Sequence, residues 1–369
     1  MAETTLNETT ANLSVDFLGL KLRNPLAITE GPLTKDAETI RWALEHEVGL
    51  VFTKGIRPEA AISPSPYIVK AGRSLMNADW SDIGFEAWLD EIRSLESGTP
   101  FVVSIAKNYV TPEEAIEMAI QLEAAGAPII SMCDYNAEQL IQTVRLGRPK
   151  IKVPLMVKLP PFLPNLEEVL KQLMEAGVDA IAAMDSIGPV LEIDIRTGLP
   201  ILGSQDGTGY LSGTAIRPVT VKYIYEISRF VDVPVVGVGG VGSARDVVEM
   251  VMAGATCVGM VAAPLLKGLG IFDRVAKDLR QLLTKLDVND INAVRGLTHR
   301  KVQQSSMRYE LRSRIDYDLC NYCKLCSKVC FVRAITDTGE RVVANRERCV
   351  SCGLCASVCP VEAIELTAL

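Results

Sequence analysis

The residues of this chain whose types and spacing most directly predict chemistry are eight cysteines near its C-terminal end. They form two runs of the pattern C-x2-C-x2-C-x3-C, CNYCKLCSKVC and CVSCGLCASVC. In this pattern three closely spaced thiolates bind three irons of one 4Fe-4S cube, and the fourth cysteine binds the other cube. The sequence therefore predicts two clusters, one held by Cys320, Cys323, Cys326 and Cys359 and a second held by Cys349, Cys352, Cys355 and Cys330.

Two other uses of these cysteines fit the sequence less well. A disulfide framework requires an oxidising compartment, and the opening residues MAETTLNETTANLS lack the basic and apolar segments of a signal peptide. Zinc sites usually separate two C-x2-C pairs by a longer spacer. Residues 315–369 resemble bacterial two-cluster ferredoxins, although Phe331 stands where a proline usually follows the fourth cysteine. Because such clusters exchange single electrons, a group that handles electron pairs is expected elsewhere in the chain.

In the first three hundred residues, charged and polar side chains directly follow apolar segments. Eight such segments alternate with amphipathic helical stretches; the segments are 25–30, 49–55, 101–108, 128–134, 155–160, 180–186, 233–240 and 257–263. This alternation predicts a (β/α)8 barrel, with an open doubly wound sheet as the alternative because it shares the local pattern. In a barrel the chemistry lies at the C-terminal ends of the strands. That rule nominates Glu30, Lys54, Lys107, Asn108, Cys133, Lys158, Asp185, Ser186, Gly239 and Gly240.

Residues 237–242, GVGGVG, match the G-x-G-x-x-G fingerprint of dinucleotide-binding sites. That interpretation also requires an acidic residue about 20 positions later, and residues 253–264 contain none. The match falls in the seventh strand–helix unit, and the loops after barrel strands 7 and 8 commonly bind phosphate. A mononucleotide phosphate is therefore the favoured ligand of these glycines, with a dinucleotide as the alternative.

Several motifs resemble the dihydroorotate dehydrogenase family of FMN barrels over residues 14–298. They are NPLAITEG, FTKG, VKLPP, DSIG, GYLSGTAIRP and VPVVGVGGVGSARD. A barrel of this family joined to a two-cluster tail is similar to the pyrimidine-reducing half of dihydropyrimidine dehydrogenase. The resemblance implies FMN and two 4Fe-4S clusters as cofactors.

The resemblance also implies roles for individual residues. Thr29, Glu30 and Gly31 would lie by the flavin, with Lys54 and Lys158 at its polar edge; Lys54 and Cys133 are the candidate catalytic residues, because Cys133 aligns with the family's acid–base cysteine. The remaining implied cofactor contacts are Asn77, Ser186, Ser212, Gly213, Gly239, Gly240, Val261 and Ala262. Val261 and Ala262 stand where the family usually has Gly-Thr, so that a hydroxyl contact to the phosphate is lost.

The asparagines with which the family binds pyrimidines are mostly replaced. Ile130 and the pair Asp134–Tyr135 stand in the segment after the fourth strand, and Asp185 replaces the asparagine before Ser186. A site that hydrogen-bonds its substrate strongly rejects analogues that leave buried polar groups unpaired, so this replacement predicts a substrate other than a pyrimidine. Lys107, Asn108 and Asp185 are the candidate substrate contacts. Lys107 could pair with an anion, Asp185 or Glu30 could hold a cation, or the three charges could neutralise one another.

The predicted protein is an oxidoreductase that acts on a C–C bond next to an activating group and exchanges electrons with a ferredoxin or a flavoprotein subunit. The alternative is an electron-transfer subunit whose FMN only relays electrons between proteins. The formal charge of −7 predicts no nucleic-acid partner, and no apolar run is long enough to span a membrane. A cytoplasmic homodimer or hetero-oligomer is expected. The predicted segments are a polar tail (1–13), the barrel (14–298), a linker (299–314) and the cluster domain (315–369).

Overall fold

A computed structural model of the chain describes residues 11–62, 64–81, 83–304 and 311–368. Most of the predicted N-terminal tail, residues 1–10, lies outside the described residues. The chain divides into two compact units between Val302 and Gln303. Each unit has its own buried apolar cluster.

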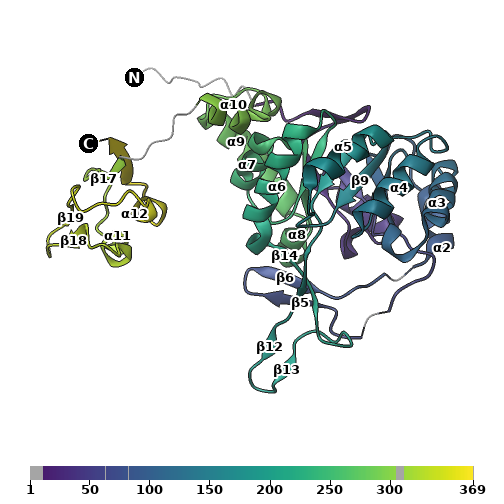
Figure 1. The fold of residues 1–369 in the computed structure, drawn as a ribbon, viewed down its shortest axis with the longest axis horizontal. Coiled ribbons are helices and arrows are strands. Elements are labelled where there is room, and N and C mark those ends of the chain that lie inside the picture. Colours follow the sequence, from purple (N-terminus) through teal and green to yellow (C-terminus); the bar gives the residue numbers. More distant parts are fainter. Residues whose placement is uncertain (1–10, 63, 82, 305–310, 369) are drawn as a thin grey trace. The chain divides into compact units, whose positions relative to one another are not determined.

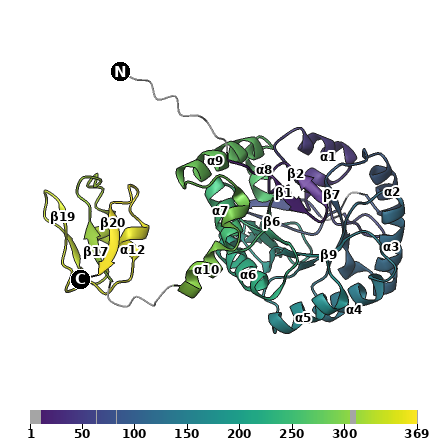
Figure 2. The ribbon, with the colours of Figure 1, turned by 90° about the horizontal axis from the view of Figure 1, so that it is seen from above.

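The first unit is a closed barrel of eight parallel strands (Figures 1 and 2). Its strands, in order around the barrel, are β3 (Leu26–Ile28), β4 (Leu50–Phe52), β7 (Phe101–Ala106), β8 (Ile130–Cys133), β9 (Leu155–Leu159), β10 (Ala180–Ala183), β15 (Val235–Val238) and β16 (Cys257–Met260). Each lies within one of the eight apolar segments. Closure is direct, because β16 pairs with β3 through Val258 opposite Leu26. The predicted (β/α)8 barrel is confirmed, and the open-sheet alternative is wrong.

Helices form a ring around the strands (Figure 2). They are α1 (Ala37–Leu44), α2 (Phe85–Arg93), α3 (Pro112–Ala124), α4 (Ala137–Gly147), α5 (Leu166–Ala176), α6 (Arg217–Phe230), α7 (Ala244–Ala253), α8 (Ala262–Lys267) and α9 (Ile271–Lys285). The start of α3 shows why the sequence predicted it. Thr111 accepts a hydrogen bond from the backbone N–H of Glu114, whose carboxylate accepts one from the backbone N–H of Thr111. This capping box satisfies two amide groups that have no partner within the helix.

A smaller antiparallel sheet lies beside the C-terminal ends of the barrel strands and was not predicted from sequence. Its strands, in spatial order, are β11 (Ile187–Val190), β14 (Gly209–Gly213), β6 (Ser74–Asn77) and β5 (Ile68–Ala71). Between β11 and β14, a hairpin of β12 (Ile193–Asp194) and β13 (Leu199–Pro200) projects from the barrel unit (Figure 1). Near the N-terminus, β1 (Val15–Phe17) and β2 (Leu20–Leu22) form a further hairpin. The small sheet brings Asn77 opposite Tyr210.

The second unit repeats one small motif twice. Its elements are β17 (Leu311–Ile315), α11 (Leu325–Val329), β18 (Ile335–Asp337), β19 (Val342–Ala344), α12 (Leu354–Ser357) and β20 (Ile364–Ala368). The first strand pairs with the last, β17 with β20, and β18 pairs with β19. Each short helix carries one buried cysteine, Cys326 on α11 and Cys355 on α12.

The predicted linker 299–314 is too long. The helix α10 (Leu297–Gln304) continues the barrel unit, where His299 stacks on Tyr225 and hydrogen-bonds to Ser228. At the other side, β17 already begins at Leu311. Residues 305–310 lie outside the described residues. Within the described part of the chain, no helix is long and apolar enough to cross a membrane.

Candidate active site and cluster sites

A cavity of about 210 Å³ lies at the C-terminal ends of the barrel strands. The barrel residues predicted for the site line it, apart from Gly31 and Lys107: they are Thr29, Glu30, Lys54, Asn77, Asn108, Cys133, Lys158, Asp185, Ser186, Ser212, Gly213, Gly239, Gly240, Val261 and Ala262. Gly31 lines an adjoining hollow that shares Lys54 and Val261 with this cavity. The barrel thus brings together residues that are far apart in sequence, while their individual roles remain predictions.

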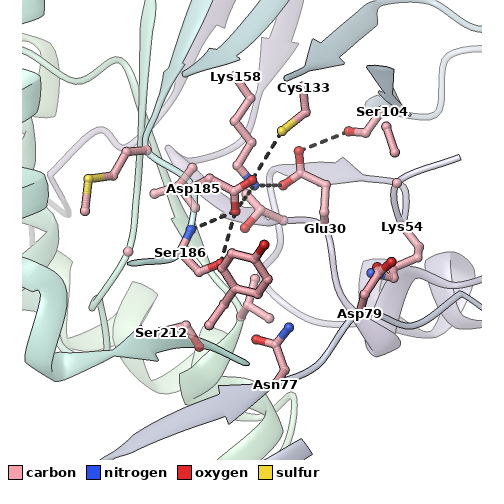
Figure 3. Close-up of a pocket in the computed structure, with 18 of the residues that line it drawn as sticks. Glu30, Lys54, Asn77, Asp79, Ser104, Cys133, Lys158, Asp185, Ser186 and Ser212 are labelled. Atoms are coloured by element: carbon pink, nitrogen blue, oxygen red, sulfur yellow. Dashed lines mark hydrogen bonds and ion pairs between the residues drawn. The ribbon is translucent and has the colours of Figure 1, made fainter. Parts of the chain in front are cut away.

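The floor of the cavity holds a network of charged side chains (Figure 3). Lys158, near the end of β9, donates to Glu30 Oε2 at 2.9 Å and lies 3.7 Å from Asp185 Oδ1. The Cys133 thiol donates to Asp185 Oδ2 at 3.2 Å. Ser104 donates to the other oxygen of Glu30, and the backbone N–H of Ser186 donates to Asp185. One ammonium group therefore faces two carboxylates.

The protonation states in this network follow from burial and charge. Burial, and next the Asp185 carboxylate, raise the pKa of the Cys133 thiol well above its ordinary value. Burial would also raise the pKa of Asp185, but Lys158 and the hydrogen bonds from Ser186 and Cys133 outweigh it, so that this pKa lies below its usual value. Burial opposes the charge on Lys158, yet Asp185 and Glu30 raise its pKa above normal. At neutral pH Asp185 is therefore ionised, Lys158 is charged and the Cys133 thiol is neutral.

Lys54 reaches the cavity from the loop after β4 and differs from Lys158. Among the described residues its ammonium group has no hydrogen-bond or ion-pair partner, and burial lowers its pKa, an effect that Asp79 and Asp185 partly offset. A buried cation without a partner is costly. Lys54 can therefore direct all its donors to a polar ligand, whereas Lys158 already donates one hydrogen bond to Glu30.

Among the polar residues that line the cavity, the sequence analysis did not propose Asp79, Ser104, Tyr109, Tyr135 or Tyr210 as site residues. Asp79 accepts from both terminal nitrogens of Arg57 at 2.8 and 2.9 Å and from the Tyr109 hydroxyl at 2.6 Å. Tyr135 and Tyr210 stack with ring centroids 5.9 Å apart. Their role at the cavity could not be identified from the local sequence pattern. Tyr210 reaches the cavity from the small sheet, and Asp79 reaches it from the long loop before α2. Asp134–Tyr135 was noted only as a departure from the family pattern.

The prediction that Lys107 contacts substrate needs correction. Its side chain is 1% exposed and does not line the cavity. Its ammonium group lies 3.0 Å from Asp134 Oδ2 and donates to Gln139 at 2.9 Å. The chain enters a 3-10 turn at this point, Lys107–Tyr109, which directs the lysine into the barrel wall. Lys107 therefore neutralises Asp134 beside Cys133 and is not available to a ligand, whereas Asn108 lines the cavity.

The far side of the cavity fits FMN. Gly213, Gly239 and Gly240 all have positive φ, and a Cβ at Gly239 or Gly240 would lie 2.7 Å from Thr220 Oγ1 or 2.4 Å from Arg217 Cβ. Gly213 ends β14 and Gly239–Gly240 follow β15, and because these residues have no side chain their amide groups can approach an anion such as a phosphate. The Thr29 hydroxyl is buried in the lining and has no hydrogen-bond partner in the described structure. The Thr29 hydroxyl and the backbone amides of these glycines are groups that a polar cofactor could satisfy.

In the second unit the two predicted cysteine sets surround two separate hollows. Cys320, Cys323, Cys326 and Cys359 line one, and Cys330, Cys349, Cys352 and Cys355 line the other. Equivalent amides donate to the crossing cysteines, Ala334 N to Cys330 Sγ at 3.1 Å and Ala363 N to Cys359 Sγ at 3.2 Å. No three candidate ligands among the described residues converge on a single metal ion. Because each thiolate of a cube binds a different iron, this spread of sulfurs fits a cluster.

Comparison with known proteins agrees with this geometry. Residues 12–283 match the family model for dihydroorotate dehydrogenase, and residues 313–366 match the model for a 4Fe-4S dicluster domain. Similar curated proteins are catalytic subunits of dihydroorotate dehydrogenase B (NAD(+)). The subunit of Methanosarcina mazei is 32% identical over 308 residues, which cover 79% of this chain and 96% of the relative. That of Methanothermobacter thermautotrophicus is 29% identical over 301 residues, with 78% and 98% covered.

Proposed function

The chain belongs to the dihydroorotate dehydrogenase family, and from this premise we propose that its substrate is a small molecule other than dihydroorotate. It is an FMN-dependent oxidoreductase that acts on CH–CH bonds and carries two 4Fe-4S clusters. In the proposed reaction a C–C bond next to an activating group is reduced or oxidised. The two clusters held by the cysteine sets would supply single-electron exchange with a ferredoxin or a partner subunit.

The charge balance at the cavity floor is the observation that carries this proposal. Dihydroorotate is an anion, whereas Glu30 and Asp185 leave the floor with one more carboxylate than Lys158 can balance. Lys107, the lysine that could have paired with an anionic substrate, is held by Asp134 outside the cavity. Lys54 remains, but the family resemblance assigns it to the flavin. A substrate that presents a neutral hydrogen-bond donor or a cation to Asp185 is favoured over one that presents a carboxylate.

Different residues of the chain would bind the cofactor, exchange a proton with the substrate and exclude water. Bound FMN supplies hydride transfer and single-electron exchange. The glycine segments at Gly213 and Gly239–Gly240 would hold its phosphate, and Thr29, Lys54 and Lys158 its polar edge. Cys133 lies within the same cavity, with its thiol protonated at neutral pH, and would exchange a proton with the substrate. Tyr135 and Tyr210 would cover the substrate and exclude water.

A partner subunit is consistent with the relatives, which are named as catalytic subunits. The projecting hairpin offers a place for subunit contact, since Ile195 is 95% exposed and Leu199 is 65% exposed. Exposed apolar side chains gathered on one projecting element are characteristic of interaction surfaces. We include assembly with a second subunit in the proposal on this ground.

Anaerobically purified protein tests the proposal in two steps. Chemical analysis should find one FMN and about eight irons per chain, the content of two cubes. The photoreduced protein is then mixed with a panel of small unsaturated compounds that are cationic, neutral or anionic, with orotate included, while flavin absorbance is followed. Reoxidation by a neutral or cationic compound supports the proposal. Reoxidation by orotate alone contradicts the proposed substrate, and reoxidation only by protein electron carriers identifies an electron relay instead.

A further inference from the structure

The Cys133 thiol is bonded to a carboxylate and does not point freely into the cavity. Its sulfur lies 3.2 Å from Asp185 Oδ2. Asp185 is itself fixed, because its other oxygen accepts from the backbone N–H of Ser186 at 2.7 Å and lies 3.7 Å from the Lys158 ammonium group. The family usually has an asparagine at this position, and an asparagine would leave the cysteine beside a neutral amide. The contact with a carboxylate therefore belongs to this chain's own residues.

Charged and titratable groups face Cys133 from several barrel elements. Glu30 follows β3, Lys158 lies on β9, Asp185 follows β10, and Tyr135 follows the cysteine's own strand β8. Lys54 lies further away, where its charge is coupled to that of Asp185. Tyr135 stays neutral, because burial and the Asp185 carboxylate raise its pKa. The immediate surroundings of the sulfur thus carry two negative charges and one positive charge.

A thiolate formed at this position would add a third negative charge next to Asp185. Removing the proton would also break the S–H hydrogen bond that satisfies Asp185 Oδ2. Lys158 stabilises the thiolate, but Glu30 holds the same ammonium group at 2.9 Å and so competes for it. The geometry and the charges both favour the protonated thiol.

We propose that Asp185 is a positioning residue that holds Cys133 as a protonated thiol, so that this site favours substrate reduction. The inference rests on the proposed function for its substrate, but the thiol's environment is independent of any substrate. In the reductive direction bound FMN would supply a hydride to one carbon of the substrate C=C bond, and the other carbon takes the Sγ proton. The S–H bond breaks, a C–H bond forms, and the electron pair left on sulfur takes a proton from water.

Electrons and protons balance in this direction. The hydride carries two electrons from FMN, and an external electron donor would replace them through single-electron exchange at the clusters. The replacement proton reaches the sulfur along the Asp185 side chain, which is 20% exposed and so touches both solvent and the thiol. In the oxidative direction Cys133 would instead have to begin as a thiolate, the state that Asp185 opposes.

The test measures the reactivity of the thiol. Only the thiolate reacts with iodoacetamide, so the labelling rate reports the thiolate fraction. The anaerobic holoprotein is labelled between about pH 7 and about pH 10, and peptide mass spectrometry quantifies Cys133 separately from the cluster cysteines. The variant Asp185→Asn keeps the shape of the side chain and removes its charge. It should label at least about tenfold faster at about pH 8, because a tenfold change corresponds to one pKa unit.

The matched control is Asp79→Asn. Asp79 lines the same cavity and also carries a negative charge, but Cys133 is not among the groups it contacts. It should leave the labelling rate of Cys133 within about twofold of the wild type, which is well below the tenfold change of one pKa unit. Equal labelling of the wild type and Asp185→Asn overturns the inference, and so does equal acceleration by both variants. If Asp185→Asn does not fold, Glu30→Gln gives the second test, with a smaller acceleration expected because it frees Lys158 for the thiolate.

A second readout uses a substrate identified in the flavin screen. The alkaline decline of kcat for reduction should begin at lower pH in Asp185→Asn, because the proton donor is lost as the thiol ionises. A purely structural role would lower kcat without moving this decline, and that result overturns the inference. Since labelling needs no substrate, its failure leaves the proposed function standing, and failure of the substrate screen leaves the labelling result standing.

Discussion

The two units of this chain use their reactive side chains in contrasting ways. In the cluster unit all the predicted ligands are cysteines, and three of the four predicted for each cube lie within seven consecutive residues, as at 320–326. In the barrel unit the candidate acid–base cysteine is a single residue, Cys133, and its protonation depends on Glu30, Lys158 and Asp185, which lie on or after other strands. A ligand set is either complete or broken, whereas a charge balance can be shifted by degrees. A substitution in the cluster unit should therefore remove a whole cluster or leave it intact. A substitution in the barrel should change turnover, stability or FMN binding by a graded amount.

The largest effect is expected from Cys352→Ala, which removes a ligand from the set of Cys330, Cys349, Cys352 and Cys355. Iron content should fall from about eight to about four per chain, because one cube is lost and the other keeps its ligands. Iron and sulfide analysis measures this, and FMN content should not change. The control Cys257→Ala alters a cysteine buried on β16, far from either set in sequence, and should keep all the iron. Eight irons in Cys352→Ala would show that the assigned ligand set is wrong.

The second-largest effect is expected on substrate turnover in Cys133→Ser, a substitution in the barrel unit. A general acid typically contributes a factor of about 10²–10⁴, so substrate turnover should fall by that amount while FMN and iron contents stay at wild-type values. Stopped-flow reoxidation of the photoreduced protein by its substrate measures the change. Turnover at the wild-type rate would reduce Cys133 to a packing residue.

A smaller effect, on the free energy of unfolding, should distinguish Lys107 from Lys54, although each follows a barrel strand. Lys107→Met breaks a buried ion pair and leaves Asp134 unpaired, which should lower the free energy of unfolding by about 3–5 kcal/mol. Lys54→Met removes an ammonium group that has no partner in the described part of the chain, so it should leave stability unchanged or raised, while it weakens FMN binding. Urea unfolding followed by tryptophan fluorescence measures the barrel, because Trp42, Trp80 and Trp88 all lie in it. Equal destabilisation by both variants would contradict the distinction between them.

The smallest effect concerns the predicted phosphate turn. Gly240→Ala would place a Cβ 2.4 Å from Arg217 Cβ at a residue with φ of 87°, whereas Gly242→Ala meets only Ala263 at an ordinary 3.7 Å. Strain of about 1–3 kcal/mol at one residue should weaken FMN binding roughly tenfold in Gly240→Ala and leave Gly242→Ala close to wild type. Fluorescence titration of the flavin-depleted protein with FMN gives both affinities. If only Gly242→Ala weakened FMN binding, the predicted location of the phosphate site at Gly240 would be wrong.

Much of the fold was accessible from the sequence because its signals are local. An apolar run such as 101–108 can be buried on both faces only inside a layered α/β structure, and caps such as Thr111 mark where the next helix begins. The cysteine spacing is equally local. The small sheet was missed because β6 and β14 are short strands that pair across more than a hundred residues of intervening chain.

The sequence by itself determined the barrel, the cluster ligand sets that now line two hollows, and which side chains follow each strand. Only the tertiary structure decided what those side chains do. Lys54, Lys107 and Lys158 have similar local settings, yet Lys54 has no ion-pair partner among the described residues, Lys107 is neutralised by Asp134, and Lys158 is shared by Glu30 and Asp185. The physical reason is that a charge is controlled by its neighbours in space. In a closed barrel those neighbours come from other strands, so no local pattern contains them.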